Sequence, residues 1–180
     1  MHKLKMHELN RLTVGEFKMI EKLPVVIVLD NIRSQNNIGS IFRTADAFRV
    51  SELYLCGITA TPPHREIHKT ALGATESVSW KYFPSTLDSI RELRNAGFTI
   101  YAVEQTSDST PVDLFYPAEN EKIALIFGNE VQGVDEKVIR EVTKCIEIPQ
   151  FGTKHSLNIA VAAGIVIWDL LCKINYAIKL

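Results

Sequence analysis

Short runs of β-branched residues alternate along the chain with segments of helical spacing. The clearest run is Val25-Val26-Ile27-Val28-Leu29, which follows Pro24 and contains no polar residue. Such a run suits a strand buried on both faces, as strands of parallel sheets are. Similar runs predict strands at 53–56, 78–83, 98–103, 123–127 and 145–148, and helices at 38–48, 64–72, 87–96 and 135–142 lie between them. This alternation predicts an α/β domain with a mostly parallel sheet flanked by helices.

Several residues mark where the predicted helices begin. Ser85 and Asp135 are good N-cap candidates, and a last helix is predicted from near Ser156 to about Ile174. Apolar residues at helical spacing over 6–20 predict a short amphipathic helix before the first strand. Because no repeat or low-complexity linker divides the chain, we expect a short N-terminal helical extension at 1–22 and one domain at 23–180.

Composition limits the class of protein. With 180 residues, 46% of them hydrophobic, the chain can bury one sizeable core. A net charge of −1 argues against a non-specific nucleic-acid binder, so RNA binding would rest on a local patch. The longest apolar run, 159–168, is too short to span a bilayer, and the first residues, charged as they are, lack the apolar stretch expected of a signal peptide. We therefore expect a soluble cytoplasmic protein without a membrane partner.

Metal and disulfide chemistry find little support in the sequence. Cys56, Cys145 and Cys172 are widely spaced and form no CxxC pair. His64 and His68 lie four residues apart, but no third ligand is evident. We expect no metal site.

Polar loops follow three of the predicted strands. They are 30–39 after the first strand, 128–130 after the fifth and 150–156 after the sixth. Parallel sheets bind ligands at the carboxyl ends of their strands. The three loops are therefore expected to form one site.

The first loop runs into a helix that carries Asn37, Gly39 and Arg43. Neither the dinucleotide fingerprint GxGxxG nor the phosphate-binding motif GxxxxGK[ST] is present. A helical arginine is usually a solvated charge, but apolar neighbours could partly enclose Arg43. An enclosed guanidinium needs an anion, and phosphate is a natural one.

The other two loops each allow a structural and a functional interpretation. Gly128 and Gly133 bracket Glu130, which by itself indicates only a glycine-rich turn. Ser156 could simply cap the last helix, whereas Asn158, inside an apolar helix start, would need hydrogen-bond partners. Small residues over 160–164 permit close approach of another backbone, either in the core or at a dimer interface.

Taken together, the three segments resemble the TrmH (SpoU) family of RNA ribose methyltransferases, which belongs to the SPOUT class. The family motif N-x-G-x-x-x-R-T-A matches residues 37–45, G-x-E-x-x-G matches 128–133, and I-P…S-L-N-x-x-x-A matches 148–162. The order and spacing agree over most of the chain. Residues 69–74 resemble the family's small-residue stretch after the second strand. The stretches 103–106 and 148–150 look closest to members that modify a guanosine of the tRNA D-loop.

The resemblance implies a fold, a cofactor and a set of site residues. It implies a C-terminal deep trefoil knot, a homodimer with the site at its interface, and S-adenosylmethionine as the cofactor. The residues carried over for cofactor binding are Val103, Glu104, Gly128, Ile148 and Leu157. Those carried over for catalysis are Arg43, Asn37, Glu130, Ser156 and Asn158.

The implied reaction is methyl transfer to a ribose 2′-hydroxyl. An arginine side chain stays protonated and is a poor general base, so Arg43 is better suited to grip a phosphate and stabilise developing alkoxide charge. A basic patch for RNA would comprise Arg33, Arg43, Arg65, Lys69 and Lys154. The expected RNA is tRNA; ribosomal RNA, and a non-catalytic RNA-binding dimer of the same fold, are the alternatives.

Overall fold

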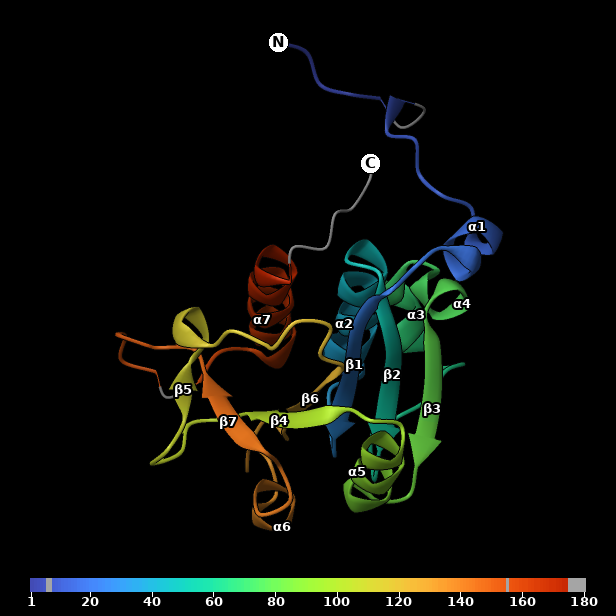
Figure 1. Cartoon of the computed structure of the whole chain (residues 1–180). Helices are drawn as coiled ribbons and strands as arrows, with labels where there is room; N and C mark the ends of the chain where they lie inside the picture. Colours follow the sequence, from blue (N-terminus) through green and yellow to red (C-terminus); the bar gives the residue numbers. More distant parts are fainter. Residues whose placement is uncertain (6–7, 155, 175–180) are drawn as a thin grey trace.

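The computed structural model describes residues 1–5, 8–154 and 156–174, and these form a three-layer α/β domain (Figure 1). Seven strands make one sheet in the order β3-β2-β1-β6-β4-β7-β5, and every neighbouring pair is parallel. The strands are β1 Leu23–Asp30, β2 Val50–Cys56, β3 Ser79–Phe83, β4 Thr99–Val103, β5 Thr110–Pro111, β6 Ile123–Phe127 and β7 Lys144–Glu147. The predicted parallel α/β class is confirmed.

Helices cover both faces of the sheet. They are α1 Val14–Met19, α2 Gln35–Ala47, α3 Arg65–Ala71, α4 Ala74–Ser77, α5 Thr86–Asn95, α6 Glu136–Ile139 and α7 Ile159–Lys173, with a 3₁₀ turn at Val112–Leu114. Buried side chains of α1 to α4 and α7 pack on one face, and those of α5 and α6 pack on the other (Figure 1).

Strand β1 shows why the apolar run predicts burial on both faces. Val25, Ile27 and Leu29 belong to the core on the α2 and α7 side. Val26 and Val28 belong to the core on the α5 side. Since successive side chains of a strand point to opposite faces, an unbroken apolar run requires a helix layer on each side.

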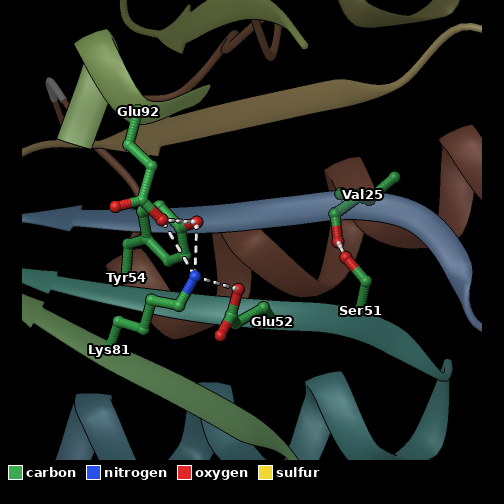
Figure 2. A network of polar contacts seen from close by, with 6 residues as sticks. All are labelled: Val25, Ser51, Glu52, Tyr54, Lys81 and Glu92. Carbon is green, nitrogen blue, oxygen red and sulfur yellow. Dashed lines mark hydrogen bonds and ion pairs between the residues drawn. The ribbon is translucent and has the colours of Figure 1, made fainter. Parts of the chain in front are cut away.

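A polar network reinforces the layer on the α5 side (Figure 2). The Tyr54 hydroxyl donates to Glu92 of α5 at 2.9 Å, and Lys81 of β3 donates to the same carboxylate at 2.9 Å. Lys81 also lies 3.5 Å from the Glu52 carboxylate. Burial, together with the hydrogen bond to Glu92, raises the pKa of Tyr54 to about 12. The network therefore links β2, β3 and α5 while Tyr54 stays protonated.

Several boundaries differ from those expected. The N-terminal helix begins at Val14, because Thr13 and Glu16 form a capping box there, and not near residue 6; residues 6–7 lie outside the described part of the chain. The helix expected over 135–142 ends at Ile139. Ser85 and Asp135 are N-caps as predicted. The short strand β5 and the one-turn helix α4 carry too few residues to show a period, and the sequence did not predict them.

The N-terminal extension contributes to the main core. Phe17 of α1 is buried in the same cluster as Leu23 and Val25. The separation of an N-terminal extension at 1–22 from a domain at 23–180 stays a prediction, because α1 packs in the same core as β1. Within the described part of the chain, no helix is long and apolar enough to cross a membrane.

Candidate active site

A cavity of about 700 Å³ lies at the carboxyl ends of β4, β6 and β7. Loops that follow these strands line it, together with the start of α7. The lining includes all five residues carried over for cofactor binding, which are Val103, Glu104, Gly128, Ile148 and Leu157. It also includes Glu130, Ser156 and Asn158. Positions distant in the sequence thus meet in one cavity, of the size that small-molecule sites have, about 300–1,000 Å³.

The loop after β6 folds back tightly on itself. Asn129 and Gly133 exchange backbone hydrogen bonds of 2.9 and 2.8 Å. A Cβ at Gly128 would lie 2.1 Å from the Gly133 carbonyl carbon and from the Val134 nitrogen, so no other residue fits there without backbone movement. The spacing of the two glycines therefore reflects close contact of two backbone segments.

Glu104, at the end of β4, fixes the same loop from the other side. Its carboxylate accepts the Val134 N–H at 3.0 Å and the Gln105 N–H at 2.9 Å. Gly133 has φ +70°, and a Cβ there would lie 2.2 Å from Glu104 Oε2. Glu104 thus shapes the cavity wall through the backbone of the loop.

Glu130 joins the loop after β6 to the loop after β1. Its carboxylate accepts the Arg33 N–H at 3.1 Å, the Ser34 N–H at 3.0 Å and the Asn37 side-chain amide at 3.3 Å. These donors lie just before α2 and in its first turn, where amide groups have no intrahelical acceptor. Glu130 is exposed, as expected of a residue in a glycine-rich turn, but three donors of another loop hold its carboxylate.

These contacts make stability depend on pH. Partial desolvation raises the pKa of Glu130, but the hydrogen bonds from Arg33, Ser34 and Asn37 lower it more, so the pKa lies below its ordinary value of 4.5. Because the pKa of Glu130 is lower in the folded protein than in the unfolded chain, the ionised carboxylate stabilises the fold. This stabilisation is complete at pH values above the unfolded pKa, and it is lost as the pH falls through the folded pKa.

We therefore expect Glu130→Gln to be less stable than wild type at about pH 7, with the difference shrinking as pH falls below 4.5 and gone once Glu130 is protonated in the folded protein. Urea unfolding of both proteins at a series of pH values measures the difference in the free energy of unfolding. Glu119→Gln, at an exposed site outside the cavity lining, is the control and should show no such trend. A pH-independent difference at Glu130 would contradict the assignment.

Asn158 and Asn37 connect the third loop to the first. Asn158 Nδ2 donates to Asn37 Oδ1 at 3.1 Å, while Asn158 Oδ1 accepts the Ala160 N–H at 2.9 Å. Asn158 is thus the N-cap of α7 and is exposed, so its expected place inside the helix is wrong, as is the N-cap role of Ser156. Glu130, Asn37 and Asn158 form a continuous chain, which we call the polar cluster. The three loops meet as the sequence predicts.

Gly39 serves packing between helices. A Cβ at Gly39 would lie 2.3 Å from the Ile67 carbonyl oxygen and 3.1 Å from the Ala71 nitrogen. The absence of a side chain therefore lets α2 pack closely on α3. The glycine of the N-x-G-x-x-x-R segment thus fixes the position of α2, which carries Asn37 and Arg43, against α3.

Arg43 lies apart from the cavity. Its side chain is exposed, so its expected enclosure by Phe42 and Ala45 is wrong: both are fully buried, on the opposite side of α2 in the core. It does not line the cavity that Gly128 and Leu157 line, and lies instead in a separate groove between α2 and α3. Its geometry suits contact with a large external ligand.

Asp30, at the end of β1, is hydrogen-bonded to the segments that carry the site, and the sequence did not predict this role. Its buried carboxylate accepts the Thr86 hydroxyl at 2.5 Å, the Asn31 side-chain amide at 2.9 Å and the Asp135 N–H at 3.2 Å. Asn129 donates to the Asn31 carbonyl at 2.7 Å. The sequence signal was an acidic residue at the end of an otherwise apolar strand, where burial requires several donors.

The charges of the cavity suit a cationic ligand. Glu104, Glu130 and Glu147 line it, and no Lys or Arg among the described residues does. S-adenosylmethionine combines a sulfonium, an ammonium and a carboxylate group. Acidic side chains suit its two positive groups, and backbone amides suit its carboxylate. No group of three potential metal ligands occurs among the residues that the structure describes.

A parallel sheet with a cavity at its carboxyl edge, bounded by a loop that requires glycine at two positions, defines a ligand-binding α/β domain. Residues 24–168 match the model of the SpoU rRNA Methylase family. Because the match covers most of the chain, the protein belongs to this family.

Curated relatives include enzymes for two kinds of RNA. The chain is 29% identical to a tRNA (guanosine(18)-2′-O)-methyltransferase of Thermus thermophilus, with 90% of this chain and 81% of the relative covered. It is also 29% identical to the 23S rRNA (guanosine-2′-O-)-methyltransferase RlmB of Neisseria meningitidis, over 80% of this chain and 56% of the relative.

Solved structures share the fold. An AdoMet-bound rRNA methyltransferase from Sinorhizobium meliloti superposes with a TM-score of 0.76 at 30% identity, covering 85% of this chain and 58% of that chain. The A. aeolicus TrmH/SpoU tRNA modifying enzyme superposes with a TM-score of 0.77 at 25% identity, covering 89% of this chain and 79% of that chain.

Proposed function

We propose that this protein is an S-adenosylmethionine-dependent RNA methyltransferase that modifies a ribose 2′-hydroxyl. The observation that carries the proposal is the meeting of three loops: one cavity contains all five residues expected at the cofactor, and the polar cluster adjoins it. The names of the relatives in both RNA classes, and the AdoMet-bound structure of similar fold, support it.

Five residues would hold the cofactor through backbone groups and the cavity walls. They are Val103, Glu104, Gly128, Ile148 and Leu157. S-adenosylmethionine supplies a methyl group activated by the sulfonium charge. The protein's own contribution is to hold the acceptor oxygen in line with that methyl group and to limit the entropy lost on reaching this arrangement.

The polar residues would place the ribose. Asn37, Glu130 and Asn158 are already hydrogen-bonded to one another, so little reorganisation is needed when RNA binds. Ser156 lines the cavity next to them. Arg43, a permanent cation, would grip a phosphate and stabilise the charge that develops on the 2′-oxygen.

The substrate that we favour is tRNA, with a guanosine of the D-loop as the modified nucleotide. The support is the likeness of residues 103–106 and 148–150 to members of that specificity, and a relative named for guanosine 18. The alternatives are ribosomal RNA, as modified by the relative from Neisseria meningitidis, and a non-catalytic RNA-binding dimer. We also propose a cytoplasmic location and a C-terminal trefoil knot.

Calorimetry with S-adenosylmethionine tests the central proposal, followed by transfer of labelled methyl groups to tRNA and to ribosomal RNA. Binding and transfer to tRNA are expected. Transfer to ribosomal RNA alone would replace the substrate, cofactor binding without transfer to any RNA would favour the non-catalytic dimer, and the absence of cofactor binding by folded protein would overturn the proposal. Mapping 2′-O-methyl groups in cells with and without the gene identifies the nucleotide.

We propose a homodimer that uses the outer surface of α7. Val161, Ile165 and Trp168 lie at helical spacing on it and are 52%, 38% and 55% exposed. The Trp168 ring centroid lies 5.6 Å from that of Phe48, so the apolar surface continues onto the end of α2. A continuous apolar surface of this kind marks an interaction site.

Trp168→Glu should convert the dimer to a monomer, because it places a charge in the apolar interface. Size-exclusion chromatography with light scattering measures the mass. Met19→Glu, on the exposed side of α1, is the control and should remain dimeric. A dimeric Trp168→Glu variant, or a monomeric wild type, would contradict the proposal.

A further inference from the structure

A surface groove between α2 and α3 carries two cations and lies apart from the cofactor cavity. We call it the α2–α3 groove; its volume is about 550 Å³. Its lining comprises Ser40, Arg43, Thr44, Ala47, Phe48, Lys69, Thr70 and Leu72. Of the five basic residues expected to form an RNA patch, only Arg43 and Lys69 line this groove. In the structure, Arg43 and Lys69 are thus the two residues of the expected patch that share one groove.

Both cations are available to an external anion. The Arg43 guanidinium makes no hydrogen bond or ion pair with any residue in 1–5, 8–154 or 156–174. Lys69 lies 4.0 Å from Glu66, and its side chain is 73% exposed. An exposed ion pair at this distance is weak, so it would yield to a better acceptor. A guanidinium and an ammonium on one groove suit a phosphate group.

The hydroxyl groups that line the groove donate to backbone carbonyls, so only the two cations are left to bind an anion. The Ser40 hydroxyl donates to the Asn36 carbonyl at 2.9 Å, Thr44 donates to the Ser40 carbonyl at 3.1 Å, and Thr70 donates to the Asn36 carbonyl at 3.0 Å. Their protons are therefore already used within the helices. The Thr70 bond also joins α3 to α2, next to the close contact at Gly39, so the groove has fixed walls.

The groove is close to the site along α2. Asn37 of the polar cluster and Arg43 are six residues apart, about 9 Å along a helix axis. This distance is short enough for a ribose at the polar cluster to bring its neighbouring phosphate near the groove. An RNA strand whose ribose meets the polar cluster can thus place a flanking phosphate in the groove.

We infer that Lys69, together with Arg43, binds a backbone phosphate of the substrate RNA that flanks the modified nucleotide. Lys69 is a positioning residue, and it binds without regard to base identity, because phosphate contacts carry no sequence information. The inference rests on the proposed function, and it adds a second anchor point for the RNA outside the cofactor cavity.

The test measures binding of full-length Lys69→Ala to two unmodified tRNA transcripts of different sequence over a range of salt concentrations. We expect affinity to fall about two- to five-fold at low salt for both transcripts. The slope of log K against log salt should fall in magnitude by about 0.7–1, the value for one lost phosphate contact. In methyl transfer, KM for RNA should rise while kcat and the affinity for S-adenosylmethionine stay unchanged.

Two variants keep the outcome interpretable. Lys69→Arg should retain the salt slope, because it keeps the charge, and Lys137→Ala, an exposed lysine of α6 on the opposite sheet face, should match wild type. An unchanged salt slope in Lys69→Ala would overturn the inference, as would weaker binding of only one transcript. Wild type that binds S-adenosylmethionine but no RNA would overturn it too, whereas failure to bind the cofactor bears on the proposed function alone.

Discussion

Arg43→Ala is expected to lower kcat for RNA methylation by about 10²–10³-fold, the loss typical for removal of one group that stabilises a developing oxyanion. Cofactor affinity should change less than about two-fold, since Arg43 does not line the cavity that Gly128 and Leu157 form. Single-turnover methyl transfer at saturating RNA measures the first quantity, and calorimetry measures the second.

Arg43→Lys separates charge from geometry. A lysine retains the positive charge but loses the planar, two-pronged donor arrangement of the guanidinium, so we expect partial activity between those of wild type and Arg43→Ala. Full activity in Arg43→Ala would remove this residue from the mechanism. An equal loss of cofactor binding would instead show that the substitution disturbs the fold of α2.

Gly128→Ala is expected to weaken S-adenosylmethionine binding by about 10- to 100-fold, or about 1.4–2.8 kcal/mol. The added Cβ would lie 2.1 Å from backbone atoms of Gly133 and Val134, so the loop must open and the cavity wall must move. Overpacking of this kind also lowers the free energy of unfolding by about 1–3 kcal/mol. Calorimetry and urea unfolding measure the two effects.

Gly15→Ala is the matched control for this glycine substitution. A Cβ at Gly15 would meet only Thr13 Oγ1, at 4.0 Å, and Gly15 lies inside α1, where alanine favours the helix. It should bind the cofactor like wild type and be slightly more stable. Normal cofactor binding by Gly128→Ala would contradict the role given to the loop after β6.

The sequence predicted the strands and the meeting of the loops because both depend on strong local signals. The run 25–29 is buried on both faces, and the carboxyl ends of parallel strands must share one edge. Hydrogen bonds that determine the site were harder to predict. Glu130 pairs with Arg33 and Ser34 at separations of more than ninety residues, and no local pattern contains such contacts.

The errors have equally specific causes. Ser156 and Asn158 are both good capping residues, and only the three-dimensional path of the loop shows that Asn158 caps α7. Arg43 lies between apolar neighbours in the sequence, but Phe42 and Ala45 turn toward the core while Arg43 turns away from it. Adjacent residues of a helix point in different directions, so neighbours in sequence do not enclose one another.

The buried Asp30 carboxylate has a consequence for the order in which the molecule assembles. It accepts hydrogen bonds from Thr86 and from Asp135, 56 and 105 residues further along the chain. Contacts between such distant segments form slowly, because a long loop must close before they contribute. The cavity walls can therefore become rigid only after β1, α5 and the segment after β6 have come together. During refolding, the ability to bind ligand should appear after most of the helical signal has returned.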